Sequence, residues 1–332
     1  MNKTHEMYQS LITELNETGY GPQANNSRKY ISENGIGLIY SISIAHQMRS
    51  MAIPIEGVDR NVDYPVWRGV RIDAVTITEY SRDQVYIQLK QASETEGHIF
   101  EIVAEDLRLG IEKITDRKKT GATVRKILKK WKDFFSTGRR PILGEKQEQG
   151  LVGELLFLNE LIKKADTKAV GFWESGTSTH DFYISNNAVE VKTSICQAPY
   201  YGHINSEYQL DKKDINGSLF LRMYALRRST RDGKRLPQII NETRELLISD
   251  ETMSDLFESK IFTLGYFDSA ADYYQNGYTI RDKYTFSIDD DFPKLIKSGI
   301  PEGIYHIEYD INVGECMDFA ISTDELFRKL EI

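Results

Sequence analysis

Two acidic residues and a lysine are spaced so that one short hairpin would bring them together. Asp181 opens a predicted strand over residues 181–185, and Glu190 and Lys192 lie two positions apart on a second predicted strand over 188–193. Side chains two positions apart on a strand point to the same face, so Glu190 and Lys192 share one side of the hairpin. Two carboxylates can hold a hard cation such as Mg2+, and a lysine beside them can orient the attacking water or offset charge on a phosphate. The group is typical of metal-assisted phosphodiester hydrolysis.

The residues between the two predicted strands favour a tight turn. Asn186 and Asn187 occupy this position, and asparagine adopts positive φ more readily than most residues. A turn here folds Asp181 back towards Glu190. Val191, which alternates with its neighbours along the strand, is then expected to point into the core.

A mixed sheet flanked by helices is predicted around this hairpin. A preceding helix over 148–164 has an apolar face broad enough to cover a sheet. The predicted strands are 169–173, 181–185, 188–193 and 218–226, and the predicted helices that follow are 238–248 and 251–259. The tail adds a strand-like stretch over 303–313 and a final helix that Ser322 and Glu325 open as a capping box.

At this point the chain resembles the PD-(D/E)XK nuclease superfamily, whose restriction-endonuclease-like core runs helix, three strands, helix, strand. More narrowly, it is similar to the bacterial family called PD-(D/E)XK motif proteins, which is often associated with restriction-modification or phage-defence genes. The resemblance rests on Gly150-Leu151-Val152-Gly153-Glu154-Leu155, then Asp181, then Glu190-Val191-Lys192. One residue departs from the motif, because His180 stands where the family has a proline that shapes the backbone.

The resemblance implies roles at the matching positions. Asp181 and Glu190 would be metal ligands together with the backbone carbonyl of Val191, and Lys192 would be the catalytic lysine. The implied cofactor is Mg2+, with Mn2+ able to substitute. Glu154 on the preceding helix either reaches the cation or lies at the margin of the apolar face and meets water, since a buried unpaired carboxylate is costly.

Other polar residues near the hairpin are weaker candidates. His203 and Gln209 follow the second strand closely enough to reach the substrate or a metal-bound water, although His203 also fits an ordinary surface histidine. Ser194 and Cys196 have no recognisable base partner, which argues against covalent catalysis. The Gly150-x-x-Gly153 spacing lacks the Gly-Lys-Ser/Thr of a phosphate loop and indicates close helix packing instead.

Two basic islands interrupt a chain whose net charge is -8. Residues 117–140 contain ten Lys or Arg residues against Asp133, and residues 222–235 contain six against Asp232. Duplex DNA carries about one charge per 1.7 Å, and most protein contacts to it are made to phosphates. The second island therefore provides candidate DNA contacts, although solvated helix and loop faces would look the same. Its basic residues are Arg222, Arg227, Arg228, Arg231, Lys234 and Arg235.

The 332 residues predict two domains, 1–140 and 141–332, separated by a glycine and a proline near residue 140. The first begins with a polar helix and a break at Gly19 to Pro22. It continues as an antiparallel sheet in which residues 38–44, 70–72, 85–89 and, less regularly, 99–103 alternate. A helix over 124–135 follows, whose aromatic stripe is predicted to be core. The chain is thus α+β in its first part and α/β in its second.

Composition argues for a cytoplasmic protein with no membrane span. No run approaches the ~18 consecutive apolar residues of a transmembrane helix, and the first residues lack the apolar core of a secretory signal. Cys196 and Cys316 have neither zinc-site nor disulfide spacing.

The leading hypothesis is a Mg2+-dependent DNA endonuclease acting in bacterial restriction or phage defence. The alternative is a non-cleaving nucleic-acid-binding or assembly subunit of a defence complex that retains the nuclease fold. An interaction protein with an accidental acid and Glu-x-Lys spacing is a third reading. Expected partners are DNA, a second copy of the chain and other restriction or defence proteins.

Overall fold

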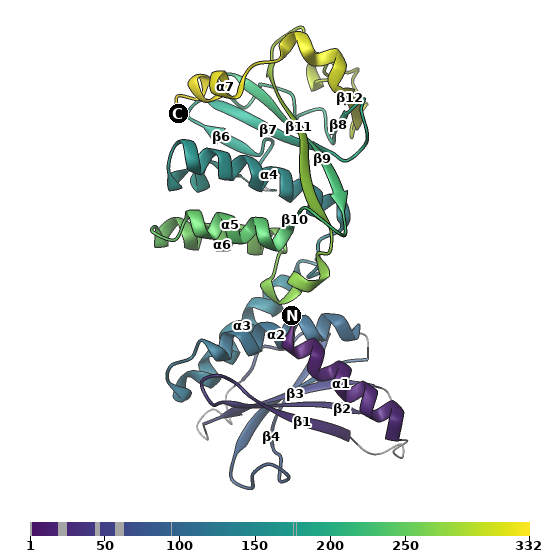
Figure 1. The fold of residues 1–332 in the computed structure, drawn as a ribbon, viewed down its shortest axis with the longest axis vertical. Helices are drawn as coiled ribbons and strands as arrows, with labels where there is room; N and C mark the ends of the chain where they lie inside the picture. The colour runs from purple at the N-terminus through teal and green to yellow at the C-terminus, as the bar shows by residue number, and fades with distance from the viewer. Residues whose placement is uncertain are drawn as a thin grey trace. The chain divides into compact units, whose positions relative to one another are not determined.

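The computed structural model describes most of the chain as two compact units (Figure 1). The described residues are 2–18, 25–43, 47–56, 63–93, 95–174, 176 and 178–332. The N-terminal unit comprises Met1–Ile142 with Phe267–Asp272, and the C-terminal unit comprises Leu143–Tyr266 with Tyr273–Ile332. The break predicted at Gly19 to Pro22, and Ile44 of the first predicted strand, lie outside the described residues. Within the described ranges, no helix combines the length and apolar content needed to cross a membrane.

The N-terminal unit contains a five-stranded antiparallel sheet with order β1-β2-β3-β5-β4. The strands are β1 (Asn25–Ile31), β2 (Gly37–Ser43), β3 (Arg49–Ile55), β4 (Val70–Thr76) and β5 (Val85–Gln91). Its helices are α1 (Lys3–Thr18), α2 (Gly97–Glu112) and α3 (Thr120–Ser136). The antiparallel sheet predicted for this part of the chain is confirmed, and β2, β4 and β5 match predicted strands.

The strand predicted over 99–103 is wrong, because these residues lie inside α2. Buried Phe100, Val103, Leu107 and Ile111 follow one another at intervals of three or four, which is the period of a helix and not of a strand. In α3 the expected stripe is confirmed, since Trp131 and Phe134 are both buried and stack against Phe267 within the same unit.

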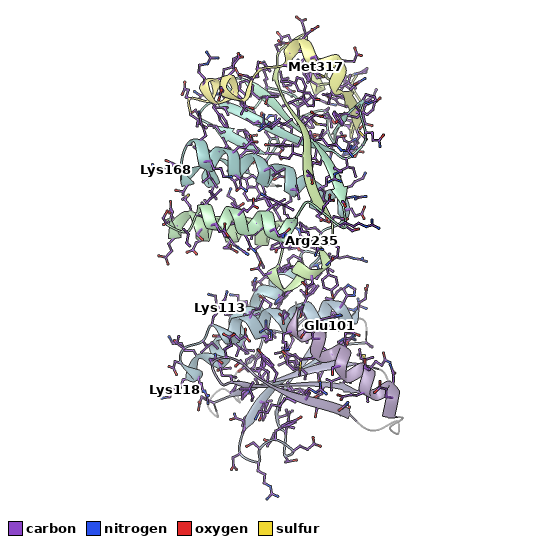
Figure 2. All side chains as sticks on the ribbon, in the orientation of Figure 1. Glu101, Lys113, Lys118, Lys168, Arg235 and Met317 are labelled. Carbon is purple, nitrogen blue, oxygen red and sulfur yellow. The ribbon has the colours of Figure 1, made fainter. Side chains whose placement is uncertain are left out.

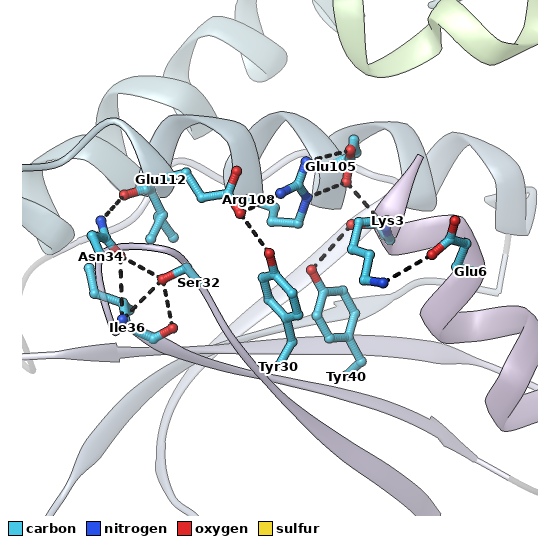
Figure 3. Close-up of polar contacts among 12 residues, drawn as sticks. Lys3, Glu6, Tyr30, Ser32, Asn34, Ile36, Tyr40, Glu105, Arg108 and Glu112 are labelled. Carbon is cyan, nitrogen blue, oxygen red and sulfur yellow. Dashed lines mark hydrogen bonds and ion pairs between the residues drawn. The ribbon is translucent and has the colours of Figure 1, made fainter. Parts of the chain in front are cut away.

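A buried polar network joins α1, α2 and the sheet of the N-terminal unit (Figure 3). Arg108 of α2 donates to Glu105 at 2.7 and 2.8 Å and lies 2.5 Å from Glu112. Tyr30 of β1 donates to Glu112 at 2.8 Å, and the backbone N–H of Thr4 donates to Glu105 at 3.2 Å. Burial disfavours the Arg108 charge, but the two carboxylates outweigh it and raise the Arg108 pKa. The helices are thus attached to the sheet by paired charges as well as by apolar contacts.

The C-terminal unit contains a mixed sheet with order β10-β11-β9-β7-β6, in which β7 and β9 run parallel. Its strands are β6 (Phe182–Ile184), β7 (Asn187–Ser194), β9 (Leu219–Ser229), β10 (Lys234–Arg235) and β11 (Gly277–Ile288). A separate antiparallel pair joins β8 (Tyr201–Ile204) to β12 (Tyr309–Asn312). The helices are α4 (Glu145–Lys164), α5 (Leu236–Leu246), α6 (Glu251–Leu264) and α7 (Thr323–Lys329). Short 3₁₀ segments are η2 (Arg117–Lys119), η3 (Thr167–Phe172), η4 (Asp268–Tyr273), η5 (Lys297–Gly299) and η6 (Val313–Phe319).

Two features of this unit differ from the predictions. Residues predicted as a strand over 169–173 form η3, and only Trp173 makes an isolated bridge, to Phe182. The strand β11 was not predicted, although it pairs with β9 along its length. Its charged residues 281–283 interrupt the apolar alternation and lie beside a register shift between Ile280 and Asp282. The capping box is supported by Ser322 Oγ, which accepts from the N–H of Glu325 at 3.1 Å.

The helix α4 approaches the sheet most closely at Gly153. A Cβ atom there would lie 2.4 Å from Thr193 Cγ2 and 3.4 Å from Val191 Cγ1, so the predicted close packing is confirmed at this residue. Thr193 cannot simply rotate away, because its hydroxyl accepts from Gln149 at 2.9 Å. A Cβ at Gly150, by contrast, would meet nothing within 4 Å.

We therefore expect opposite effects from alanine at these two glycines. Gly153→Ala should lower the free energy of unfolding by about 1–3 kcal/mol, the usual cost of overpacking. Gly150→Ala should raise it by up to about 1 kcal/mol, because alanine is the better helix former. Urea denaturation followed by circular dichroism measures both. Equal effects at the two positions would contradict the close approach of α4 to β7.

Candidate active site

The site is built on the hairpin formed by β6 and β7, which confirms the predicted turn. Phe182 pairs with Val189 and Ile184 with Asn187, leaving Ser185 and Asn186 as the turn residues. The positive φ falls on Ser185, at 56°, and not on either asparagine. The register places Asp181 just before β6 at the level of Glu190 on β7.

Asp181 is tied to the second strand by its own side chain. Its Oδ2 accepts a hydrogen bond from the backbone N–H of Val191 at 2.7 Å. Burial raises the pKa of Asp181 well above its ordinary value, and the neighbouring carboxylates of Glu190 and Glu154 raise it further, against the opposing effects of Lys192 and the Val191 N–H. Three acids therefore share one electrostatic environment, although they come from three different elements.

Glu190 and Lys192 are in contact on the same face of β7, as expected from their spacing. Glu190 is fully buried, with 0% of its surface exposed, and Lys192 Nζ lies 2.8 Å from its Oε1. The contact is close in distance but poorly directed, so neither oxygen of Glu190 has a well-formed hydrogen bond. Burial lowers the pKa of Lys192, but Glu190 and Asp181 outweigh it and the net effect raises that pKa. Lys192 is therefore a fixed cation beside a buried anion.

Gln209 joins this group, and His203 does not. Lys192 Nζ donates to Gln209 Oε1 at 3.0 Å, and the same oxygen accepts from the N–H of Asn205 at 2.8 Å. The ring of His203 is half exposed, and its nitrogens lie 2.7 Å from Asp310 and 3.8 Å from Glu308. His203 thus belongs to a surface cluster between β8 and β12, whereas Gln209 holds the lysine in place.

Glu154 reaches the site from α4. Its Oε2 accepts from the indole N–H of Trp173 at 2.7 Å. The pKa of Glu154 rises to about 7: burial is the main cause and Glu190 adds to it, while Trp173 and Lys192 oppose the shift. A hydrogen bond from a buried tryptophan therefore holds this carboxyl close to the other two acids.

This raised pKa predicts a pH-dependent stability for the metal-free protein. A carboxyl that binds its proton more tightly when folded stabilises the fold below its unfolded pKa, and this contribution is lost as pH rises towards 7. Glu154→Gln keeps an oxygen for Trp173 but cannot ionise. The stability of Glu154→Gln relative to the native protein should therefore increase from pH 4.5 to 8, measured by thermal unfolding in a chelating buffer. A pH-independent difference would contradict the shift.

His180, Asp214 and Tyr183 form a connected group that the sequence did not reveal. His180 is 1% exposed, and its Nε2 lies 3.2 Å from Asp214 Oδ1 while its Nδ1 lies 3.8 Å from Glu190 Oε2. The hydroxyl of Tyr183 donates to Asp214 Oδ2 at 2.6 Å. Burial raises the pKa of Asp214, but Tyr183 and His180 outweigh it and lower that pKa, so Asp214 is ionised at neutral pH. A polar His180 beside an apolar strand was the one available signal, since Asp214 lies far away in sequence.

The donor set fits a hard cation held by few protein ligands. Among the described residues, no three His, Cys, Asp or Glu side chains are arranged around one metal position. Magnesium, however, keeps several waters and takes only one or two carboxylates. Glu190 presents two buried oxygens without a hydrogen bond, and such groups are expected to have a partner. Asp181 and Glu190 therefore suit Mg2+, and the Val191 carbonyl remains a predicted ligand.

Arg222 has to be removed from the predicted DNA contacts. It is 1% exposed, and its guanidinium donates to Glu160 on α4 at 2.6 Å and to Thr285 on β11 at 2.6 Å. A buried arginine with these partners cannot reach a phosphate backbone. Its side chain alternates inward at the centre of β9, which its place in a basic run concealed.

The rest of the C-terminal basic island, residues 227–235, is exposed. Arg227 pairs with Asp232, Arg228 with Glu145 and Lys234 with Glu242, whereas Arg231 and Arg235 pair with no acid in the described chain. Arg235 lies at the start of α5 (Figure 2). Lys192 pairs with Met223 of β9, so Arg227 lies four residues beyond the site along the strand, roughly 13 Å away.

A comparison with protein families places the chain in one of them. The family model described as "Putative PD-(D/E)XK family member, (DUF4420)" matches residues 8–314, which is most of the chain. The chain therefore belongs to this family. Proteins of the PD-(D/E)XK class are generally nucleases, and they generally use divalent metals such as Mg2+. Searches of curated proteins and of solved structures gave no match.

Proposed function

We propose that this protein is a Mg2+-dependent DNA endonuclease whose active site is the β6–β7 hairpin. The observation that carries the proposal is Glu190, a fully buried carboxylate with two unbonded oxygens beside the ammonium of Lys192. An isolated buried charge of this kind is costly, and a bound cation would offset that cost. Family membership supports a nuclease over other metal-dependent activities.

Each residue of the site has a distinct proposed role. Asp181 and Glu190 bind the metal, with the Val191 carbonyl and Glu154 as further candidate ligands. The bound metal would act as a Lewis acid on the phosphate and lower the pKa of an attacking water. Lys192 places a positive charge where negative charge develops on the phosphate, and Gln209 fixes its ammonium at 3.0 Å.

The order of elements supports a restriction-endonuclease-like core for the C-terminal unit. The helix α4 precedes the β6–β7 hairpin, and β9 follows beside β7 in parallel. The hairpin thus lies at the edge of a mixed sheet covered by α4, where a duplex can approach one end of β7. We extend the proposal to cleavage by two copies, one per strand, in cytoplasmic restriction or phage defence.

The direct test is incubation of the purified protein with supercoiled plasmid, with Mg2+ or Mn2+ and with a chelator. Nicked or linear DNA should form only with metal. A mobility shift without cleavage in both metals would overturn the endonuclease proposal in favour of a non-cleaving DNA-binding subunit. Neither binding nor cleavage would favour an interaction protein.

The exposed arginines of the C-terminal basic island should contribute to DNA affinity by binding phosphates. Replacing Arg231 and Arg235 by alanine should weaken binding across all sequences and reduce the slope of log affinity against log salt by about 1 for each phosphate that is no longer neutralised. Fluorescence anisotropy at several salt concentrations measures this. Lys163→Ala with Lys168→Ala removes the same charge from exposed positions on α4 and η3, and an equal change of slope in that control would contradict a specific role.

A further inference from the structure

His180 is buried against the proposed metal ligands at a position where the family motif has a proline. Its Nε2 faces Asp214 Oδ1 at 3.2 Å, and its Nδ1 faces Glu190 Oε2 at 3.8 Å. A carboxylate only accepts hydrogen bonds, so the Nε2 atom carries the proton in the contact with Asp214. Asp214 is itself fixed by the hydroxyl of Tyr183 at 2.6 Å. The imidazole is therefore held from one side in a single orientation.

The other side of the ring has no partner. His180 Nδ1 and both Glu190 oxygens are buried without a hydrogen bond, and 3.8 Å is too long for a direct one between Nδ1 and Oε2. Buried polar atoms without partners are rare, and an ion is one of the standard explanations. Two metal bonds of about 2.1 Å can join atoms up to about 4.2 Å apart, so one cation fits between these two.

We infer that His180 Nδ1 and Glu190 Oε2 bind the same divalent cation, with Asp214 and Tyr183 as positioning residues. Metal-binding histidines almost always donate their other N–H to a carboxylate or carbonyl, which is the arrangement of His180 and Asp214. The inference rests on the proposed function, since it concerns the same metal. It also changes the expected metal, because imidazole suits transition ions such as Mn2+ or Co2+, whereas Mg2+ prefers oxygen ligands.

The test is electron spin echo spectroscopy of the full-length protein loaded with Mn2+. Modulation from a coordinated imidazole ¹⁴N is expected in the native protein and should disappear in His180→Ala. His203→Ala is the matched control, because His203 also pairs with an aspartate but lies on the surface. Its spectrum should keep the nitrogen signal.

Metal affinities, measured by calorimetry, provide the second readout. His180→Ala should lower Mn2+ affinity by about 10- to 100-fold and Mg2+ affinity much less, and Asp214→Asn should also lower Mn2+ affinity by about 10- to 100-fold, as for other groups that orient a ligand. Bound Mn2+ without ¹⁴N modulation in the native protein would overturn the inference and leave the proposed nuclease intact. Absence of any Mn2+ or Mg2+ binding would overturn both. The native spectrum decides the matter even if a variant fails to fold.

Discussion

Cleavage of DNA should fall by on the order of 10³-fold when Glu190 is replaced by glutamine or Lys192 by methionine, as when other preorganised charges are removed from active sites. Glu190→Gln keeps the shape of the side chain but removes the negative charge that would hold the metal. Lys192→Met keeps the length of the side chain but removes the cation that would face the phosphate. Both variants should be compared with the native protein by initial rates of plasmid nicking in saturating Mg2+.

Folding of these variants is expected to survive, which makes the activity readout interpretable. Glu190 is a buried charge without a well-directed hydrogen bond, and neutralising such a group removes a desolvation cost. In Glu190→Gln the Lys192 ammonium still has Gln209 as an acceptor. Asp310→Asn is a suitable control, because Asp310 is an exposed acid paired only with His203 in the described contacts. Metal-dependent cutting that persists in both site variants would exclude the hairpin as the active site.

Replacing Arg222 by methionine should lower the free energy of unfolding by about 3–5 kcal/mol, the range found when one partner of a buried ion pair is removed. Arg222 connects three elements: it donates to Glu160 of α4 at 2.6 Å, to Thr285 of β11 at 2.6 Å and to Thr323 of α7 at 3.1 Å. Its removal leaves Glu160 with only Lys283, at 3.3 Å, for compensation. Urea denaturation measures the loss of stability.

Two further variants separate the ion pair from general damage to β9. Arg231→Met removes an exposed arginine after the same strand and should change stability by no more than about 0.5 kcal/mol. Glu160→Gln added to Arg222→Met should recover part of the stability, because it removes the carboxylate that was left unpaired. If Arg222→Met costs less than about 1 kcal/mol, the pair is not the structural junction described here.

The predictions that succeeded depend on short-range periodicity. The β6–β7 hairpin, the shared face of Glu190 and Lys192, the apolar face of α4 and the buried stripe of α3 all follow from side-chain alternation within one element. The failures lie where local signals conflict. In α2 an apolar run fits strand or helix, in η3 an apolar run was too short to form a strand, and in β11 three consecutive charges conceal a strand that β9 holds in place.

The amino-acid sequence by itself determined which side chains of the hairpin face the same side and which helix covers it, because these relations span a few residues and follow from backbone geometry. Only the tertiary structure decided which distant residues meet them. It brought Gln209 to Lys192, Asp214 to His180 and Glu160 to Arg222, and so made the first a support, the second a candidate metal ligand and the third a buried junction. These contacts join residues 17 to 62 positions apart, and their formation depends on how the whole C-terminal unit packs.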